Sequence, residues 1–502
     1  MKIKSFAQLF TLILMLSLVL GACTTPAAEA PAAEAPAVEA PAAEEAAAAE
    51  EAAAAEEAVQ GLLPAIINFP DQIAGGEAVN ISVVQKPPDS QPEAVEAWEA
   101  QVVRFQEMYP NVTIEGTDYA YAPDSFAALV AGDQIPTLFE VYLNDPEKMI
   151  DQGVAADLTS IIKDQNLDQV FNTDILDIAA KDGKYYGLPR FAYAMGLAYN
   201  MEMLNTAGFD APPTTWEELA TMAQALTDRD AGVAGFSFIT DGSGAAGWHM
   251  TTIAYNFGLD NAEIVSAADA GYTANFASGP MLEAANFIDD LRWKYDVLPL
   301  EYLAWDTNGE ALATGRAAMI VMAGDQFTWM KQTYTDAPIA DFGFAPLPAG
   351  PNGKSTSLVG GNIAMVNAKA TPGEMEAAVY WRLFTQFDPD EIIANYESSK
   401  VDPAVVIGSP TLPLYVGEYE AAVEETMLAY ANMPVENYAA FLNGITSGTA
   451  TMQPEPLIAG QEFYTAMGTV VSTIVADEGA DPAEVLTQAA DTFQTNVLDL
   501  ID

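Results

Sequence analysis

The chain has 502 residues, half of them apolar, which is enough for two or more domains with buried cores. It carries 71 Asp and Glu against 18 Lys and Arg, and a formal net charge of -53 strongly disfavours binding to the phosphates of nucleic acids. The single cysteine excludes an intramolecular disulfide. With one histidine, His249, zinc sites built from Cys and His and Cys-His nucleophilic dyads are close to excluded. Neutral or cationic ligands, and hydrolysis by paired carboxylates, stay compatible with this composition.

Residues 1–22 have the pattern of a secretory signal peptide. Two lysines give a basic start, and the apolar run that ends at Leu20 is shorter than an ordinary membrane-spanning helix. The sequence LGAC, which ends at Cys23, resembles a bacterial lipobox, and this resemblance implies cleavage before Cys23 and a lipid on its sulfur. An ordinary signal peptide followed by an incidental cysteine is the alternative.

Residues 23–58 form a low-complexity stretch of Ala, Glu and Pro. Proline recurs at every fifth position from Pro26 to Pro41, which forbids a regular helix there and favours an extended spacer. We expect either a stalk between the lipid and the folded part or a tolerated tail, because the stretch lacks the large side chains that build a core. Residues 59–78 form a transition segment with proline and glycine breaks, to which the sequence assigns no role.

The folded part is expected to begin near Val79 with alternating strands and helices. Strands are predicted over 79–84, from 112 and over 138–143. A helix is predicted after Pro92, because five apolar side chains between Val95 and Tyr109 recur at helical spacing. A short helix is predicted over 125–130. This alternation indicates an α/β sheet with ligand loops at the carboxyl ends of its strands.

The stretch 182–226 organises the middle of the chain. Aromatic and small apolar residues fill 185–199 and are interrupted by one proline and one glycine, which predicts two short extended segments joined by a crossover. A turn rich in glycine and proline follows. Thr215 and Glu218 then offer a capping box, in which a hydroxyl and a carboxylate bind free amides at the start of a helix that runs to Leu226.

The second half of the chain is less strongly patterned. Residues 235–240 predict a strand and 241–249 a glycine-rich loop. This loop lacks the lysine of a phosphate-binding loop, and His249 is expected to be a loop residue. Helices are predicted near residues 281–295, 374–387, 454–476 and 482–498. Residues 388–452 give only fragments.

Several motifs, in this order, resemble the family 1 extracellular solute-binding proteins, the maltose-binding-like receptors of ABC importers. They are DGKYYGLP from residue 182, YN at 199–200, AGFDAPPTTWEEL from 207, GEALATGRAAMIVMAG from 309 and GGN at 360–362. Thr137 stands where the family usually has Asp, and Leu312 stands where it usually has Phe. The resemblance extends over residues 79–500.

The resemblance implies an α/β fold of two lobes, the periplasmic binding protein type II fold, with multiple chain crossovers at a hinge. Lobe 1 would comprise residues 79–190 and a return of the chain at 339–370. Lobe 2 would comprise residues 191–338 and, mainly as helices, 371–502. The segment from Arg190 to Ala194 would be one of three crossings and a part of the hinge.

If the chain crosses between lobes, the cleft between them is the expected ligand site. Aromatic rings can cover the apolar faces of a sugar, and charged or amide groups can bind its hydroxyls. On these grounds, and on the family's positions, the candidate ligand-binding residues are Lys86, Asp89, Glu140, Asn144, Arg190, Tyr193, Trp248, Trp305, Asp325, Trp329, Gly361, Asn362 and Tyr464. Core packing or a solvated surface position is the alternative for each of them. The tryptophans at 98, 216, 293 and 381 are expected in the core, and no catalytic residue, metal or cofactor is expected.

The leading hypothesis is a lipid-anchored extracytoplasmic receptor of an ABC importer that binds a mono- or oligosaccharide and is not an enzyme. Its expected partners are the solute, the permease subunits and the lipid bilayer, but no nucleic acid. Through acylated Cys23 it would sit as a monomer on the outer face of the cytoplasmic membrane, at the cell surface or in the periplasm. The alternatives are a surface hydrolase with paired carboxylates, and the same fold binding a polyamine or peptide or serving a sensor.

Overall fold

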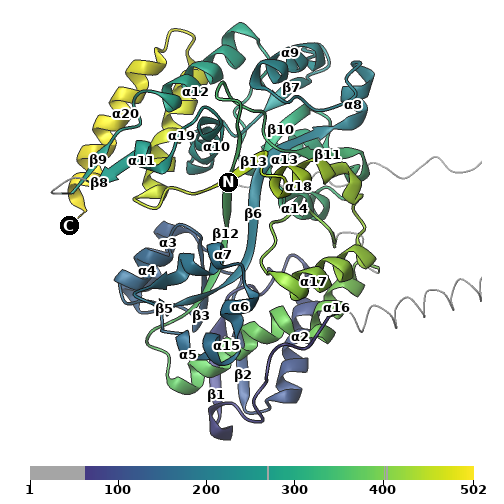
Figure 1. Ribbon diagram of the computed structural model, residues 1–502, viewed down its shortest axis with the longest axis vertical. Helices are drawn as coiled ribbons and strands as arrows, with labels where there is room; N and C mark the ends of the chain where they lie inside the picture. The colour runs from purple at the N-terminus through teal and green to yellow at the C-terminus, as the bar shows by residue number, and fades with distance from the viewer. Residues whose placement is uncertain (1–62, 268–270, 401, 403–404, 502) are drawn as a thin grey trace, which may run out of the picture. The chain divides into compact units, whose positions relative to one another are not determined.

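The computed structural model describes residues 63–267, 271–400, 402 and 405–501 (Figure 1). The predicted signal peptide (1–22), the predicted lipidation site Cys23, the predicted stalk (23–58) and the first residues of the transition segment lie outside the described residues. Within the described part of the chain, every helix is too short or too polar to cross a membrane.

The described strands form one mixed sheet of nine strands and two separate pairs. The large sheet has the order β2-β1-β3-β12-β6-β10-β7, with β11 paired to β6 and β13 paired to β12. The strand β1 is parallel to β2 and β3, as the alternation of strands and helices predicts, whereas β12 is antiparallel to both β3 and β6. The strands are β1 (Val79–Val83), β2 (Val112–Gly116), β3 (Leu138–Tyr142), β6 (Gly187–Asn200), β7 (Ala234–Ser237), β10 (Ala317–Ala323), β11 (Phe342–Ala345), β12 (Ser355–Val366) and β13 (Ala450–Pro454), with the pairs β4 (Ala180–Lys181) and β5 (Lys184–Tyr185), and β8 (Val265–Ala267) and β9 (Tyr272–Ala274).

The strand β6 joins the two halves of this sheet. Its residues 187–194 pair with β12, and residues 195–200 pair with β10 and β11. The prediction of two short extended segments is therefore wrong, because one strand of 14 residues runs through both. Pro189 does not break it, since the register shifts there: Asn362 and Ile363 are consecutive on β12 but pair with Phe191 and Pro189. Arg190 is the extra residue of this bulge. The neighbouring Pro189 lacks a backbone N–H, and proline is tolerated next to a bulge because the regular pairing is interrupted there.

A first group of helices packs on β1, β2, β3 and the adjoining part of β12. Alternate side chains of β3 enter opposite cores, since Leu138 packs with Phe105 and Trp381 whereas Phe139 packs with Phe126. The helices of this group are α2 (Pro92–Met108), α3 (Pro123–Gly132), α4 (Pro146–Asp151), α5 (Thr159–Asp164), α6 (Leu167–Val170), α7 (Thr173–Leu176), α15 (Pro372–Phe387), α16 (Pro389–Ser398) and α17 (Gly417–Tyr430).

The described part of the transition segment belongs to this first group. Ile73 is fully buried in its core, and the Tyr109 hydroxyl donates a hydrogen bond of 2.8 Å to the carbonyl of Pro70. Asn111 also donates, from its amide nitrogen to the carbonyl of Ile73 at 3.0 Å. The folded unit therefore includes residues before the predicted start at Val79.

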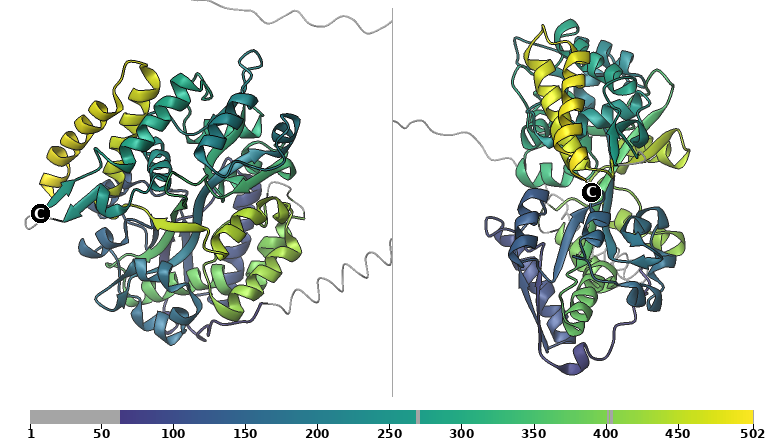
Figure 2. Two further views of the ribbon diagram at one scale, coloured as in Figure 1. Left: turned by 45° about the horizontal axis from the view of Figure 1, so that its top comes forward. Right: turned by 90° about the vertical axis from the view of Figure 1, so that its left-hand side faces the viewer.

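A second group of helices packs on β7, β10, β11 and the end of β6. Met319 and Ile320, neighbours on β10, again enter two different cores. In Figure 2 the last two long helices lie side by side at the edge of this group, and Phe463 and Phe493 join them with ring centroids 6.1 Å apart. The helices are α8 (Met201–Thr206), α9 (Trp216–Leu226), α10 (Gly244–Asn256), α11 (Asn261–Ile264), α12 (Pro280–Asp289), the π-helix η3 (Asp290–Lys294), α13 (Trp305–Ala313), α14 (Gln326–Thr333), α18 (Ala439–Thr446), α19 (Gly460–Ala476) and α20 (Pro482–Asn496).

The expectation that residues 371–502 lie mainly with the second lobe needs a correction for α15, α16 and α17. Trp381 and Phe384 of α15 and Tyr419 of α17 are buried in the same core as Val79 of β1. An amphipathic helix must bury its apolar stripe, but the stripe does not specify which sheet covers it.

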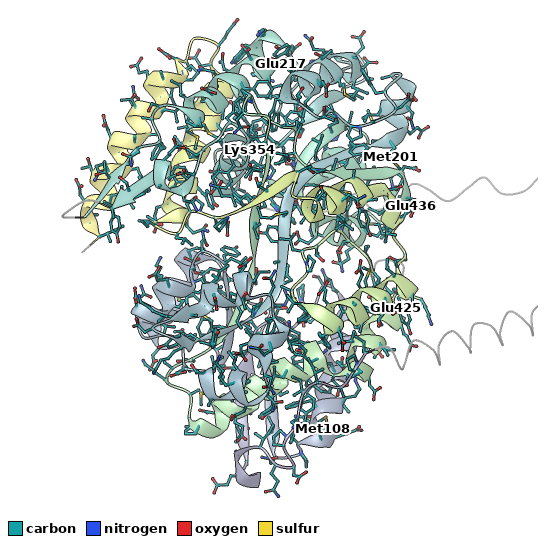
Figure 3. The ribbon with its side chains drawn as sticks, viewed as in Figure 1. Met108, Met201, Glu217, Lys354, Glu425 and Glu436 are labelled. Carbon is teal, nitrogen blue, oxygen red and sulfur yellow. The ribbon has the colours of Figure 1, made fainter. Side chains whose placement is uncertain are left out.

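The surplus of acidic residues reaches the surface of both groups. Glu217 on α9, Glu425 on α17 and Glu436 before α18 are exposed and project from the ribbon (Figure 3). Surface charge of one sign keeps a protein soluble and disfavours contact with polyanions.

The capping interaction predicted at Thr215 is present in modified form. The Thr215 hydroxyl accepts from the backbone N–H of Glu218 at 3.2 Å, but the Glu218 carboxylate accepts from Thr214, not from Thr215. We expect Thr215→Ala to lower the free energy of unfolding by about 1 kcal/mol, because one amide at the helix start loses its acceptor. Thr221→Ala, on the exposed side of the same helix, is the control and should change stability by less than about 0.5 kcal/mol. Denaturant unfolding measures both, and equal midpoints for the two variants would contradict the capping role.

Candidate functional site

A cavity of about 360 Å³ lies beside β6 and β12, where these strands connect the two groups of elements. This volume falls within the range of small-molecule sites, about 300–1,000 Å³. Side chains from both groups line it, and the second group contributes the starts of α10, α13, α14 and α19. The lining residues are Tyr142, Phe191, Tyr193, Gly244, Ala245, Trp248, Trp305, Ala323, Asp325, Gln326, Asn362, Glu455, Gln461 and Tyr464.

Aromatic side chains form much of the cavity wall. The rings of Tyr193 and Trp248 meet edge to face at 6.0 Å, and Phe191 lies 5.8 Å from Tyr193. Trp305 also faces the cavity, and Trp329 lies behind it with ring centroids 4.5 Å apart. The indole N–H of Trp248 is buried without a partner in the structure. Such a wall can cover apolar ligand faces and still offer a hydrogen-bond donor.

Two acidic side chains reach the same cavity. Glu455 is 6% exposed, and burial raises its pKa to about 8, although the Tyr464 hydroxyl donates to it at 3.1 Å. Burial also raises the pKa of Asp325, to about 6, against the opposing effect of a backbone hydrogen bond and of Arg190. One carboxylate oxygen of Asp325, Oδ1, is buried and unpartnered in the structure. Both groups are therefore held in surroundings that oppose their negative charge.

A polar network at the bulge separates this cavity from a neighbouring one of about 400 Å³. Glu140, 6% exposed, pairs with Arg190 Nε at 3.2 Å and accepts from Asn362 Nδ2 at 3.2 Å. Asn362 lines the first cavity, whereas Glu140 and Arg190 line the second together with Arg382, whose pKa burial lowers to about 10. The network ties β3, β6 and β12 together where the sheet halves join.

The thirteen candidate residues are distributed unevenly around this site. Six line the first cavity: Tyr193, Trp248, Trp305, Asp325, Asn362 and Tyr464. Glu140 and Arg190 line the neighbouring cavity. The remaining five line neither cavity. Lys86 and Asp89 pair with each other at 3.2 Å, and Asn144 accepts from Gln461 at 3.4 Å. Trp329 lies behind Trp305, and Gly361 lies on β12 between β6 and β3. Ligand contact by any of the thirteen stays a prediction.

Other residues of the cavity wall were not predicted. Tyr142 could have been found, because it follows Glu140 by two positions on a strand and shares its face. Gln326 directly follows the candidate Asp325. Glu455 offered no signal, since it is one of 71 acidic residues and lies in a stretch without a clear pattern.

His249 is not a loop residue, because α10 begins at Gly244 and carries it into the core. The side chain is 0% exposed, its Nδ1 accepts from the backbone N–H of Ile239 at 3.2 Å, and burial lowers its pKa to about 3. Helix α10 lies close against α19, and a side chain at Gly247 would meet the carbonyl of Tyr464. Gly247 therefore allows a close contact between two helices. In this stretch glycine indicates helix packing and not a loop.

The buried His249 predicts a specific loss of stability in acid. The unfolded histidine takes up a proton below pH of about 6.5, whereas the folded one does so only near 3, so stability falls as the pH drops through this window. The slope should be at most about 1.4 kcal/mol per pH unit. We expect His249→Asn, whose amide oxygen can still accept from Ile239, to have a shallower dependence between pH 7 and 4.5. Parallel stability curves for the two proteins would disprove this role.

Solved structures share the fold. A maltose-bound protein of T. maritima aligns with a TM-score of 0.65 at 20% identity, covering 84% of this chain and 100% of that one. A substrate-binding protein of Listeria monocytogenes in complex with cycloalternan aligns at 0.64 and 19% identity, covering 84% and 99%. A Mycobacterium tuberculosis protein in complex with glycerophosphocholine aligns at 0.64 and 18% identity, covering 83% and 98%. The predicted two-lobed periplasmic binding protein fold is confirmed by these matches.

Curated relatives match a part of the chain. A binding protein of Brucella abortus strain 2308 is 27% identical over 208 residues, which are 41% of this chain and 47% of the relative. An ABC transporter-binding protein of Deinococcus radiodurans is 28% identical over 199 residues, 37% of this chain and 44% of the relative. The match thus spans about half the length of these relatives. The family model described as bacterial extracellular solute-binding protein matches residues 88–380, more than half of the chain. This protein therefore belongs to the bacterial extracellular solute-binding protein family.

Proposed function

We propose that this protein is the extracytoplasmic receptor of an ABC importer and that it binds a mono- or oligosaccharide in the 360 Å³ cavity. The observation that carries the proposal is the cavity wall, where aromatic rings adjoin amide, hydroxyl and carboxylate groups. Rings cover the apolar faces of sugars, and the polar groups suit their hydroxyls. Family membership and the saccharides bound by two similar structures support the assignment.

Binding would work by closing the two lobes around the solute. Periplasmic binding proteins close by hinge motion, and hinges absorb the backbone change at a few residues. Here the bulge at Arg190 and the paired strands β6 and β12 are the proposed hinge. One lobe would hold β1–β3 with α15–α17, and the other β7, β10 and β11 with α8–α14 and α18–α20. The permease would recognise the closed form, in which the solute adds contacts to both lobes.

The membrane location is a further part of this proposal. A lipid on Cys23 would tether the receptor as a monomer to the outer face of the cytoplasmic membrane, with residues 23–58 as a stalk. Acyl chains anchor proteins by burying methylene groups in the bilayer. Partition of the full-length protein into a detergent phase, lost in Cys23→Ser, tests the tether separately from solute binding.

A panel of neutral mono- and oligosaccharides tests the solute. A saccharide at 100 times its Kd should stabilise the protein by about 2.7 kcal/mol, which raises Tm. Trp248 and Trp305 line the cavity, so intrinsic fluorescence should change as well. Release of sugar from oligosaccharides by the purified protein would instead indicate a hydrolase that uses Asp325 and Glu455, and no response to any saccharide would disprove the assignment.

A further inference from the structure

The acidic groups of the cavity wall narrow the class of solute. Among its described lining residues, Asp325 and Glu455 are acidic and none is Lys or Arg. The Glu455 side chain is buried, with 6% of its surface exposed, and the carboxylate oxygen Oδ1 of Asp325 is buried without a partner. Arg190 acts on Asp325 from the neighbouring cavity, but its own charge is paired with Glu140.

Two of the three other buried carboxylates in the described residues have a cationic partner, whereas the third, Asp145, 5% exposed, accepts from the Tyr121 hydroxyl at 2.9 Å. Glu140 has Arg190 at 3.2 Å and an amide donor from Asn362. Glu391, 3% exposed, has Arg104 on both of its oxygens at 2.7 Å. A buried carboxylate without a cation is costly, and the group must take up a proton or gain a positive partner. At the cavity a positively charged solute can supply that partner.

The surrounding rings suit a cation as well. A positive group within about 6 Å of an aromatic face is attracted by the ring quadrupole, most strongly by Trp. Trp248 and Trp305 line the cavity together with Tyr193, which lies within the electrostatic influence of both Glu455 and Asp325. The free indole N–H of Trp248 in addition calls for an acceptor, such as a hydroxyl oxygen. The acidic side chains favour a positively charged solute, and the indole N–H favours one with hydroxyl oxygens. A hydroxylated amine has both properties.

We propose that the solute is an amino sugar or another polyhydroxylated amine, whose ammonium group pairs with an acidic side chain of this cavity, Asp325 or Glu455, beside its aromatic wall. The proposal rests on the assignment of the 360 Å³ cavity as the solute site. It narrows that assignment from saccharides in general to those with a positive charge. The negative charge of the whole protein favours the approach of the same class.

Matched pairs of sugars that differ only in one amino group test this proposal. Isothermal titration calorimetry at neutral pH would compare glucosamine with glucose, galactosamine with galactose, and chitosan disaccharide with cellobiose. At least one amino sugar should bind ten times or more tighter than its neutral partner. Asp325→Asn and Glu455→Gln, which keep the side-chain shapes, should reduce that preference to threefold or less. Circular dichroism and Tm would verify that both variants are folded.

The outcomes separate the two proposals. Neutral sugars that bind as tightly as their amino partners, or more tightly, overturn the amine and leave the saccharide receptor in place. An amine preference that survives in the double variant Asp325→Asn/Glu455→Gln overturns the assignment to these carboxylates. Binding of neither member of any pair overturns the amino-sugar proposal and, with a silent neutral panel, the saccharide receptor too. Choline is a further probe. If choline binds and no sugar does, the cavity is a cation site and the assignment to saccharides is wrong.

Discussion

Replacing Trp248 with leucine should weaken saccharide binding by about 30-fold or more, equivalent to about 2 kcal/mol. The reason is the double role of this side chain, which supplies a ring face to the cavity and the buried N–H that has no partner in the structure. Leucine fills part of the volume but offers neither. Titration calorimetry with the saccharide that binds the wild type most tightly measures the loss, and the fluorescence change on binding should shrink in parallel.

Trp293 provides the control for this experiment. It does not belong to the cavity wall, and its indole N–H donates to the carbonyl of Ile474 at 3.0 Å. Trp293→Leu should therefore lower Tm but leave the affinity within about twofold of the wild type, because a lost structural hydrogen bond costs about 0.5–1.5 kcal/mol and touches no ligand. If Trp248→Leu also binds within threefold of the wild type, the cavity is not the solute site.

The strands of the first group could be predicted because their apolar residues are local. β1 alternates apolar and polar residues and β3 is mostly apolar, helices separate them, and their bounds differ from the predicted ones by one residue. For β6 the sequence predicts two segments, because Pro189 and Gly196 normally signal breaks. In the structure, Pro189 lies at a bulge, and a side chain at Gly196 would meet the ring of Phe344 at 2.4 Å. Here proline and glycine mark tertiary contacts instead of chain breaks, and a local pattern cannot distinguish the two.

The sequence predicts those residues of the candidate site that are conspicuous in their own stretch of chain. Aromatic residues at loop ends, such as Trp248 and Trp305, stand out in a sequence and do line the cavity. Glu455 does not stand out: its partner Tyr464 follows nine residues later, but its other neighbours around the cavity, such as Tyr142 and Tyr193, come from distant parts of the chain. The position of Lys86 just after a strand predicts a ligand contact, yet its ammonium group is paired with Asp89 and it lies outside the cavity wall. Charge and position along the chain do not reveal which groups converge.

Two adjacent glycines of β12 should respond very differently to substitution by alanine. Gly361 has a φ of 151°, and a side chain there would lie 2.2 Å from the carbonyl oxygen of Phe191 and 2.9 Å from the Cα of Ala192. These are backbone atoms of β6, so the clash can be relieved only by separating the two strands that join the sheet halves. We expect Gly361→Ala to lower the free energy of unfolding by about 3 kcal/mol or more. Denaturant midpoints measure the loss.

Gly360→Ala is the matched variant, because the three atoms nearest to its side chain would all belong to the ring and hydroxyl of Tyr193, at 2.5–2.7 Å. A ring can rotate where a backbone cannot, and the direction open to Tyr193 is the cavity that it lines. Gly360→Ala should therefore stay close to wild type in stability, within about 1–2 kcal/mol, but bind its solute about tenfold more weakly. Gly361→Ala, where it folds, should show the reverse order of effects. Equal stability of the two variants would mean that β6 and β12 can slide past each other at the bulge, and the proposed hinge would then lack the fixed strand pairing on which closure depends.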